Sequence, residues 1–180
     1  VQSVRLTVQG GIPASAHRAL TVATLAGALQ PSSPGPVTPV NAERIAQERD
    51  VRAHCDASTM KRDFMSLLRV EVVIGGERHS ASGTVLGHKH GRMVQLDDYV
   101  LDAIPEGPMI ITFHRDEPGV VGQLGTVLGS AGCNISRMQI GQDKDTATAL
   151  GILNLDGAVD DSLIDAVRAI EAVDNARLVR

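Results

Sequence analysis

The stretch Met109–Ile140, MIITFHRDEPGVVGQLGTVLGSAGCNISRMQI, predicts a strand, a tight loop, a helix and a second strand. Residues 109–113 form a short apolar run that is typical of a buried strand. Pro118 suits the first turn of a helix, and apolar residues then recur at helical spacing over 120–131. We therefore expect the loop after the first strand and the start of the second strand, at Asn134, to meet at one end of a sheet and to form a corner for a small ligand.

The chain after Ile140 completes a compact unit. A polar turn leads to a strand over 147–155, acidic residues at 160–161 open a helix, and residues 176–179 form a last strand. The resulting order, βαββαβ, is the ferredoxin-like arrangement, in which two helices cover one face of a four-stranded antiparallel sheet.

The chain before Met109 predicts a mixed α/β domain and makes the whole protein α+β. Asn41 stands where it would cap a helix, with Val40 and Ile45 placed as a hydrophobic staple. The expected elements are a strand over 3–9, helices over 19–29 and 42–49, and two hairpins, 64–74 with 77–86 and 92–96 with 99–104. The segment PEGP at 105–108 is stiff and predicts a linker, which divides the chain into domains 1–104 and 109–180.

Composition excludes several classes of function. Aromatic residues make up 2% of the 180 residues and the net charge is −4, so a broad nucleic-acid surface is not expected. The two cysteines, Cys55 and Cys133, have no metal-ligand spacing, and free thiols are the better expectation. No apolar run has the length of about 20 residues that a membrane span needs, and no signal peptide is visible, so we expect a cytoplasmic protein without membrane contact.

The sequence also argues against chemistry within this chain. The glycines at 119, 122, 125 and 129 lack the GxGxxG spacing of a dinucleotide-binding loop, and we expect them to permit close packing instead. The acidic pairs at 97–98 and 160–161 are explained by a hairpin turn and a helix start. We therefore expect no catalytic residue here.

Two groups of motifs carry a family resemblance. The segments Asp102–Gly107 (DAIPEG), His114–Ile135 (HRDEPGVVGQLGTVLGSAGCNI) and Met138–Gly141 (MQIG) resemble the ACT domain of D-3-phosphoglycerate dehydrogenases and the segment leading into it. The segments Val40–Ala42 (VNA), Ser82–Thr84 (SGT) and Met93–Leu96 (MVQL) resemble the intervening domain of the longer forms of that enzyme.

The resemblance implies a regulatory function. ACT domains are βαββαβ modules that bind amino acids, and the intervening domain is regarded as a second, anion-binding regulatory site. The catalytic domains, which use NAD, would precede Val1, so this chain is expected to be inactive alone and to hold no cofactor. It is then a regulatory fragment of an NAD-dependent dehydrogenase of serine biosynthesis. The alternatives are a regulatory chain of an iron–sulfur L-serine dehydratase and a free-standing ACT-type amino-acid sensor.

The resemblance also places an effector site for L-serine or another small amino acid at His114, Asp116, Gly119 and Asn134. Asp116 would pair with the ammonium, Gly119 would let backbone N–H groups approach the carboxylate, and His114 would bond the carboxylate or hydroxyl. The site would lie across the interface of a homodimer or tetramer. In the alternative, Asp116 caps the helix, Asn134 only starts a strand and His114 is solvated.

Basic residues predict a second, anion-binding site, and the resemblance implies phosphate or phosphohydroxypyruvate as its ligand. The candidates are Lys61, Arg62, Lys89 and Arg92, of which Arg92 matches a basic family position. A merely solvated basic loop is the alternative. His88 and His90 lack a third ligand at a telling spacing, so no metal is expected.

Overall fold

A computed structural model describes residues 1–58, 64–87, 89–143, 146–157 and 159–180. The chain forms two compact units, Val1–His90 and Gly91–Arg180. Each unit combines helices with strands, so the predicted α+β class is confirmed. Within the described ranges, no helix is long and apolar enough to cross a membrane.

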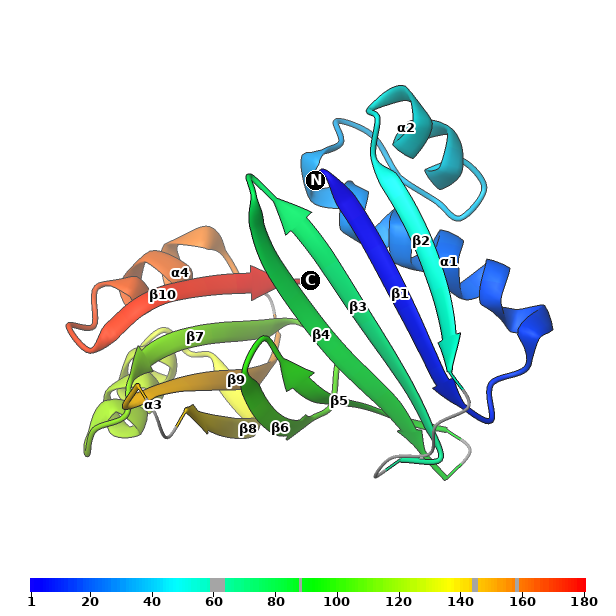
Figure 1. Cartoon of the computed structure of the whole chain (residues 1–180). Coiled ribbons are helices and arrows are strands. Elements are labelled where there is room, and N and C mark those ends of the chain that lie inside the picture. The colour runs from blue at the N-terminus through cyan, green and yellow to red at the C-terminus, as the bar shows by residue number, and fades with distance from the viewer. Residues whose placement is uncertain (59–63, 88, 144–145, 158) are drawn as a thin grey trace. The chain divides into compact units, whose positions relative to one another are not determined.

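The first unit is a sheet with helices on one face (Figure 1). Its strands are ordered β2-β1-β3-β4, with β1 and β2 parallel and the other neighbours antiparallel. The parallel pair is joined through α1 and α2, since parallel strands need a crossover connection. The elements are β1 (Ser3–Gly10), α1 (Ala14–Leu29), a 3-10 turn (Gln30–Ser32), α2 (Ala42–Glu48), β2 (Arg52–Ser58), β3 (Ser66–Ile74) and β4 (Glu77–Leu86).

The core of this unit lies between β1 and the helices. Val4 on β1 packs with Leu25 and Leu29 of α1, and all three are buried. At the end of β1, Gly10 has φ +83°, and a Cβ there would lie 2.1 Å from the Met65 carbonyl oxygen. Only glycine fits at this position, and it ends the strand.

The predicted cap of α2 is wrong in its details. Asn41 occupies the N-cap position, but its Oδ1 accepts from the Thr38 backbone N–H at 2.7 Å and its Nδ2 donates to the Pro36 carbonyl. Val40 is 94% exposed, so it does not pack against Ile45 as a staple. The side chain of Asn41 stabilises the preceding turn instead of the helix.

The second unit contains the predicted βαββαβ order, which is confirmed. Its sheet is ordered β10-β7-β9-β8 with antiparallel neighbours. The elements are β5 (His90–Leu96), which begins at the last residue of the first unit, β6 (Tyr99–Ala103), β7 (Met109–Arg115), α3 (Val120–Ser130), β8 (Asn134–Asp143), β9 (Thr148–Asp156), α4 (Asp161–Arg168) and β10 (Val173–Val179).

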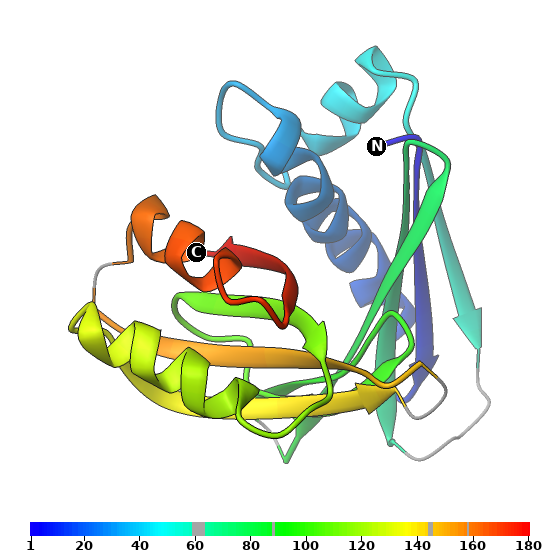
Figure 2. The ribbon, with the colours of Figure 1, turned by 90° about the vertical axis from the view of Figure 1, so that its left-hand side faces the viewer.

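The helices α3 and α4 cover one face of this sheet (Figure 2). Leu124 of α3 and Val167 of α4 are buried against Ile110 of β7 and Leu153 of β9. Asp160 caps α4 as predicted, because its Oδ1 accepts from the backbone N–H of Leu163 at 3.0 Å.

The hairpin of β5 and β6 covers part of the opposite face. Leu101 on β6 is buried against Leu150 and Ile152 of β9. Gly141 on β8 allows this approach, since a Cβ there would lie 3.0 Å from the Val100 carbonyl oxygen. The hairpin of β5 and β6 thus belongs to the second compact unit, which begins at Gly91. The junction at 105–108 stays a prediction from the sequence.

Candidate functional site

The end of β7 carries His114, whose side chain is almost completely buried (2% exposed). Its Nδ1 lies 2.9 Å from the backbone carbonyl oxygen of Arg115. Because a carbonyl oxygen only accepts, Nδ1 carries the proton of this bond, which leaves Nε2 as the ring nitrogen that can accept. This Nε2 is buried without a hydrogen-bond partner in the described part of the chain. The alternative in which His114 is solvated is therefore wrong. The unpaired Nε2 of His114 suits a hydroxyl or ammonium donor of a ligand.

Asp116 lies two residues further on and is exposed. Its Oδ2 accepts from Gln142 Nε2 at 2.8 Å, and its backbone N–H donates to the Ala147 carbonyl at 2.9 Å. It does not cap α3, because the N-cap residue is Gly119 and no side chain bonds there. The capping alternative is therefore wrong, and the Asp116 carboxylate stands at the surface near His114.

Gly119 has φ +96°, a left-handed conformation that favours glycine. The helix that follows has no side-chain cap and no acidic residue in its first turn. Its first backbone N–H groups therefore lack a side-chain acceptor, and they attract anions.

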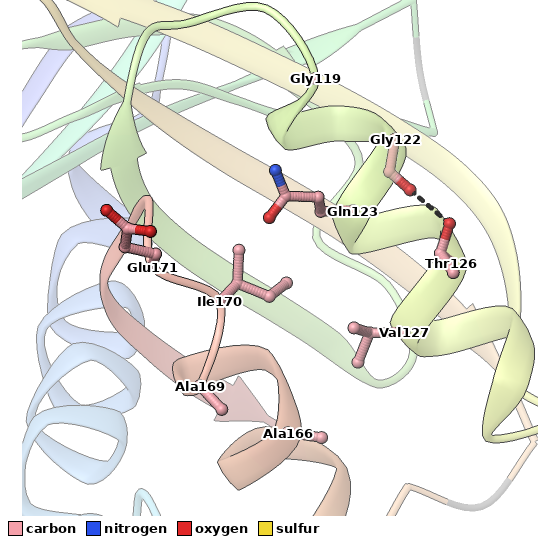
Figure 3. A pocket seen from close by; sticks show the side chains of 9 residues that line it. All are labelled: Gly119, Gly122, Gln123, Thr126, Val127, Ala166, Ala169, Ile170 and Glu171. Carbon is pink, nitrogen blue, oxygen red and sulfur yellow. Dashed lines mark hydrogen bonds between the residues drawn. The ribbon is translucent and has the colours of Figure 1, made fainter.

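A groove of about 760 Å³ begins at Gly119 and lies between α3 and the segment after α4. Figure 3 shows Val127 and Ile170 on its apolar floor, with the polar ends of Gln123 and Glu171 nearer the loop.

Asn134 does not join this loop within one chain, so the expected corner is wrong. Asn134 pairs with Asp156 at one end of β9, whereas His114 pairs with Ala149 near the other end. The reason is that β7 and β8 run in the same direction, so that α3 carries the chain back before β8 begins. Asn134 is exposed, and its Nδ2 donates to Asp156 Oδ2 at 2.7 Å.

The four predicted anion-binding residues are not gathered into one described site. Lys61 and Arg62, like His88, lie outside the described residues. Lys89 is exposed in a turn of the first unit. Arg92 is more informative, because it lines a pocket that lies wholly within the second unit.

This pocket has a volume of about 340 Å³ and holds two guanidinium groups, from Arg92 on β5 and Arg137 on β8. Asp102 also lines it, with its Oδ1 3.2 Å from Arg92 Nε. On the pocket wall, Asn154 is buried and donates to the carbonyls of Ile104 and Glu106, both at 2.9 Å. Two arginines in a cavity of this size suit a small anion with several oxygens.

A β-bulge places Arg137 in the pocket. The register of β8 against β9 shifts between Ile135 and Arg137, so that Ser136 and Arg137 stand opposite Asn154. Ile135 and Met138 consequently both pack on the helix side of the sheet, while Arg137 faces the pocket. The sequence analysis missed Arg137. The signal available there was the spacing of the apolar residues 135, 138 and 140, which breaks a strict alternation.

Cys133 lies in an environment that keeps its thiol unreactive. Burial raises the pKa of the Cys133 thiol, and the Asp156 carboxylate raises it further, so that this sulfur stays protonated near neutral pH. Among the residues described, His, Cys, Asp and Glu form no group of three or more that suits a metal ion.

Comparisons with known proteins agree with this architecture. Residues 1–97 match the D-3-phosphoglycerate dehydrogenase intervening domain, and residues 109–172 match the ACT domain. The D-3-phosphoglycerate dehydrogenase of Mycobacterium tuberculosis is 32% identical over 98% of this chain and 33% of its own length. The enzymes of that name from Synechocystis and Bacillus subtilis are 31% and 26% identical, over 89% and 99% of this chain and 29% and 34% of their own. The chain thus spans about a third of the length of these curated relatives.

Proposed function

The chain belongs to the D-3-phosphoglycerate dehydrogenase family through its intervening and ACT domains, and from this premise we propose that it regulates such an enzyme by binding L-serine. The observation that carries the proposal is the buried Nε2 of His114, an acceptor without a partner in the described residues. A buried polar atom left unpaired is unfavourable, and a ligand hydroxyl at this loop supplies the missing donor.

The other groups of the loop fit the remainder of an amino acid. The exposed carboxylate of Asp116 pairs with the ligand ammonium. The uncapped start of α3, where Gly119 brings no side chain, receives the ligand carboxylate. The hydroxyl then reaches His114, which makes serine a better ligand than alanine.

A second copy of the chain completes the site. β8 is an edge strand in the sheet order, so a second β8 can pair with it. If the two strands run antiparallel, the start of the second β8 lies beside the end of the first, where Gln142 bonds Asp116. Asn134 of the second copy then stands next to Asp116, a position that it does not reach within its own chain.

Calorimetric titration with L-serine and L-alanine tests the ligand. We expect serine to bind about fivefold more tightly than alanine, since one hydrogen bond contributes roughly 1 kcal/mol. The variant His114→Phe should lose this preference, and His90→Phe, at an exposed histidine, serves as the matched control. Absent heats at millimolar serine, with an unchanged melting temperature, would refute serine as the effector.

Mixing two inactive variants tests the shared site. Asp116→Ala and Asn134→Ala should each lose serine binding, because each homodimer then has two damaged sites. After subunit exchange, half of the dimers are mixed and each has one intact site, so about a quarter of the binding capacity should return. A mixture that stays inactive, although subunit exchange is demonstrated, would contradict an interface site.

The pocket of Arg92 and Arg137 supports a second proposal, the binding of phosphate or a phosphorylated acid such as phosphohydroxypyruvate. Arg137→Ala should weaken phosphate binding at least tenfold, whereas Arg177→Ala, at an exposed arginine of β10, should leave it unchanged. Equal phosphate affinity in both variants would remove Arg137 from the site.

The relatives support a proposal for the activity of the whole protein. Each relative reported above is a D-3-phosphoglycerate dehydrogenase, which favours a dehydrogenase over a dehydratase partner or a free-standing sensor. We place NAD and the catalytic residues in the remainder of such a protein, which acts in serine biosynthesis in the cytoplasm. Measuring the dehydrogenase activity of the natural full-length protein with and without L-serine tests this assignment, and the absence of NAD-dependent activity would overturn it.

A further inference from the structure

The anion pocket of the second unit already contains an anionic group. Asp102 Oδ1 lies 3.2 Å from Arg92 Nε, which is the contact that a bound carboxylate or phosphate oxygen would make. Arg92 also donates through Nη1 to the Gly91 carbonyl at 3.0 Å. The guanidinium of Arg92 is therefore occupied by groups of its own chain.

The two arginines of the pocket differ in this respect. In the described part of the chain, the side chain of Arg137 has no ion-pair or hydrogen-bond partner, although Arg137 lines the same cavity as Arg92. Asp102 thus neutralises one guanidinium and leaves the other free. A ligand that bridges both must replace the Asp102 carboxylate at Arg92.

Exposure indicates which partner moves. The side chain of Asp102 is 68% exposed, whereas that of Arg92 is 22% exposed. The backbone of β6 is fixed here, because Leu101 and Ala103 on either side are buried in the core beneath the hairpin. The carboxylate can turn into water without disturbing the strand, and Arg92 stays at the pocket wall.

From this arrangement we infer that Asp102 is an internal competitor, which holds Arg92 while the pocket is empty and leaves it when a small dianion binds. The inference rests on the proposed anion site and defines what that site selects. A monocarboxylate would only exchange one carboxylate for another at Arg92. A phosphate dianion gains contacts with both guanidiniums, so the competitor biases the pocket toward dianions.

The test is a calorimetric titration of the chain and of Asp102→Asn with inorganic phosphate and with acetate. Asn keeps the size of the side chain and removes its charge. We expect phosphate to bind about twofold to fivefold more tightly to Asp102→Asn, the range that a partly exposed ion pair supports. Acetate should gain more than phosphate, so that the preference for phosphate shrinks. Asp98→Asn, at an exposed position of the same hairpin, controls for net charge.

The outcomes separate the two proposals. If Arg137→Ala abolishes phosphate binding but Asp102→Asn leaves it equal or weakens it, the anion site stands and the competitor is overturned. Asp102 is then a positioning partner of Arg92. Absence of phosphate binding to the chain and to Asp102→Asn, with both folded by circular dichroism, would overturn the site and the competitor together. A crystal structure with phosphate bound should show Asp102 turned away from Arg92, and a retained contact would contradict the inference.

Discussion

Replacing Asn154 by alanine should destabilise the second unit through two backbone carbonyls. Asn154 is 4% exposed, and its Nδ2 donates to the carbonyl oxygens of Ile104 and Glu106, both at 2.9 Å. These bonds hold the segment between β6 and β7 against β9. Alanine removes both donors and leaves the two acceptors at a place that water reaches poorly.

The expected loss is about 2 kcal/mol of unfolding free energy. Each hydrogen bond contributes roughly 1 kcal/mol net, and a buried acceptor left unpaired adds to the loss. Asn134→Ala is the matched control, since this exposed amide has one bond, to the exposed Asp156. Its loss should stay below about 0.5 kcal/mol, as for other surface substitutions.

Urea unfolding followed by tyrosine fluorescence measures the difference. The chain has one tyrosine and no tryptophan, and Tyr99 lies in the second unit with its hydroxyl 2.8 Å from Thr148 Oγ1. The signal therefore reports on the unit that contains Asn154. An Asn154→Ala midpoint equal to that of Asn134→Ala, at equal slope, would show that water replaces the lost donors and would refute the argument.

Three further predictions concern packing, pH and thiol reactivity. Gly151→Ala should cost about 1–3 kcal/mol in urea unfolding, because its Cβ would lie 2.5 Å from the Thr112 hydroxyl oxygen, and an unchanged midpoint would contradict this clash. A hydroxyl and a backbone N–H in the first turn of α4 lower the pKa of Asp160. The contribution of Asp160 to the free energy of unfolding is therefore present above the ordinary carboxylate pKa of about 3.9, and it is lost as the pH falls through the lowered value. Asp160→Ala should therefore lower the melting temperature at pH 7 and not at strongly acid pH; a pH-independent difference would disprove the linkage. Alkylation at neutral pH, followed by peptide mass spectrometry, should modify Cys55 before Cys133, since the Cys133 thiol is buried with a raised pKa, and the reverse order would count against that environment.

Local patterns predicted most of the secondary structure. The alternation of residues 3–9 predicted β1, the helical spacing of 120–131 predicted α3, and Gly75-Gly76 predicted the turn between β3 and β4. Each of these signals lies within a few residues of the element that it specifies. The helix α1 was predicted too short, because its first turns, from Ala14, carry no regular apolar stripe.

What the sequence analysis missed depends on distant parts of the chain. The side chain of Asn41 was expected to cap a helix, but a preceding turn competes for the same oxygen. Asn134 was placed beside His114 because the two are joined by one helix, whereas the direction of that helix separates them. Arg137 received no function, although the apolar spacing at 135, 138 and 140 breaks a strict alternation, because the pocket that the bulge turns it toward is formed by residues far away in the chain.

The bulge in β8 determines how Arg137 can enter or leave the pocket that it shares with Arg92 during evolution. Ser136 and Arg137 together stand opposite one residue, Asn154, so the strand carries one residue more than its pairing needs. Deleting the codon for Arg137 would leave Ile135 and Met138 on the helix side and keep the pairing on both sides. Inserting an arginine codon into a regular strand would create the bulge and place an arginine at this position. A single in-frame event is thus enough in principle to add or remove this arginine without rebuilding the ACT domain around it.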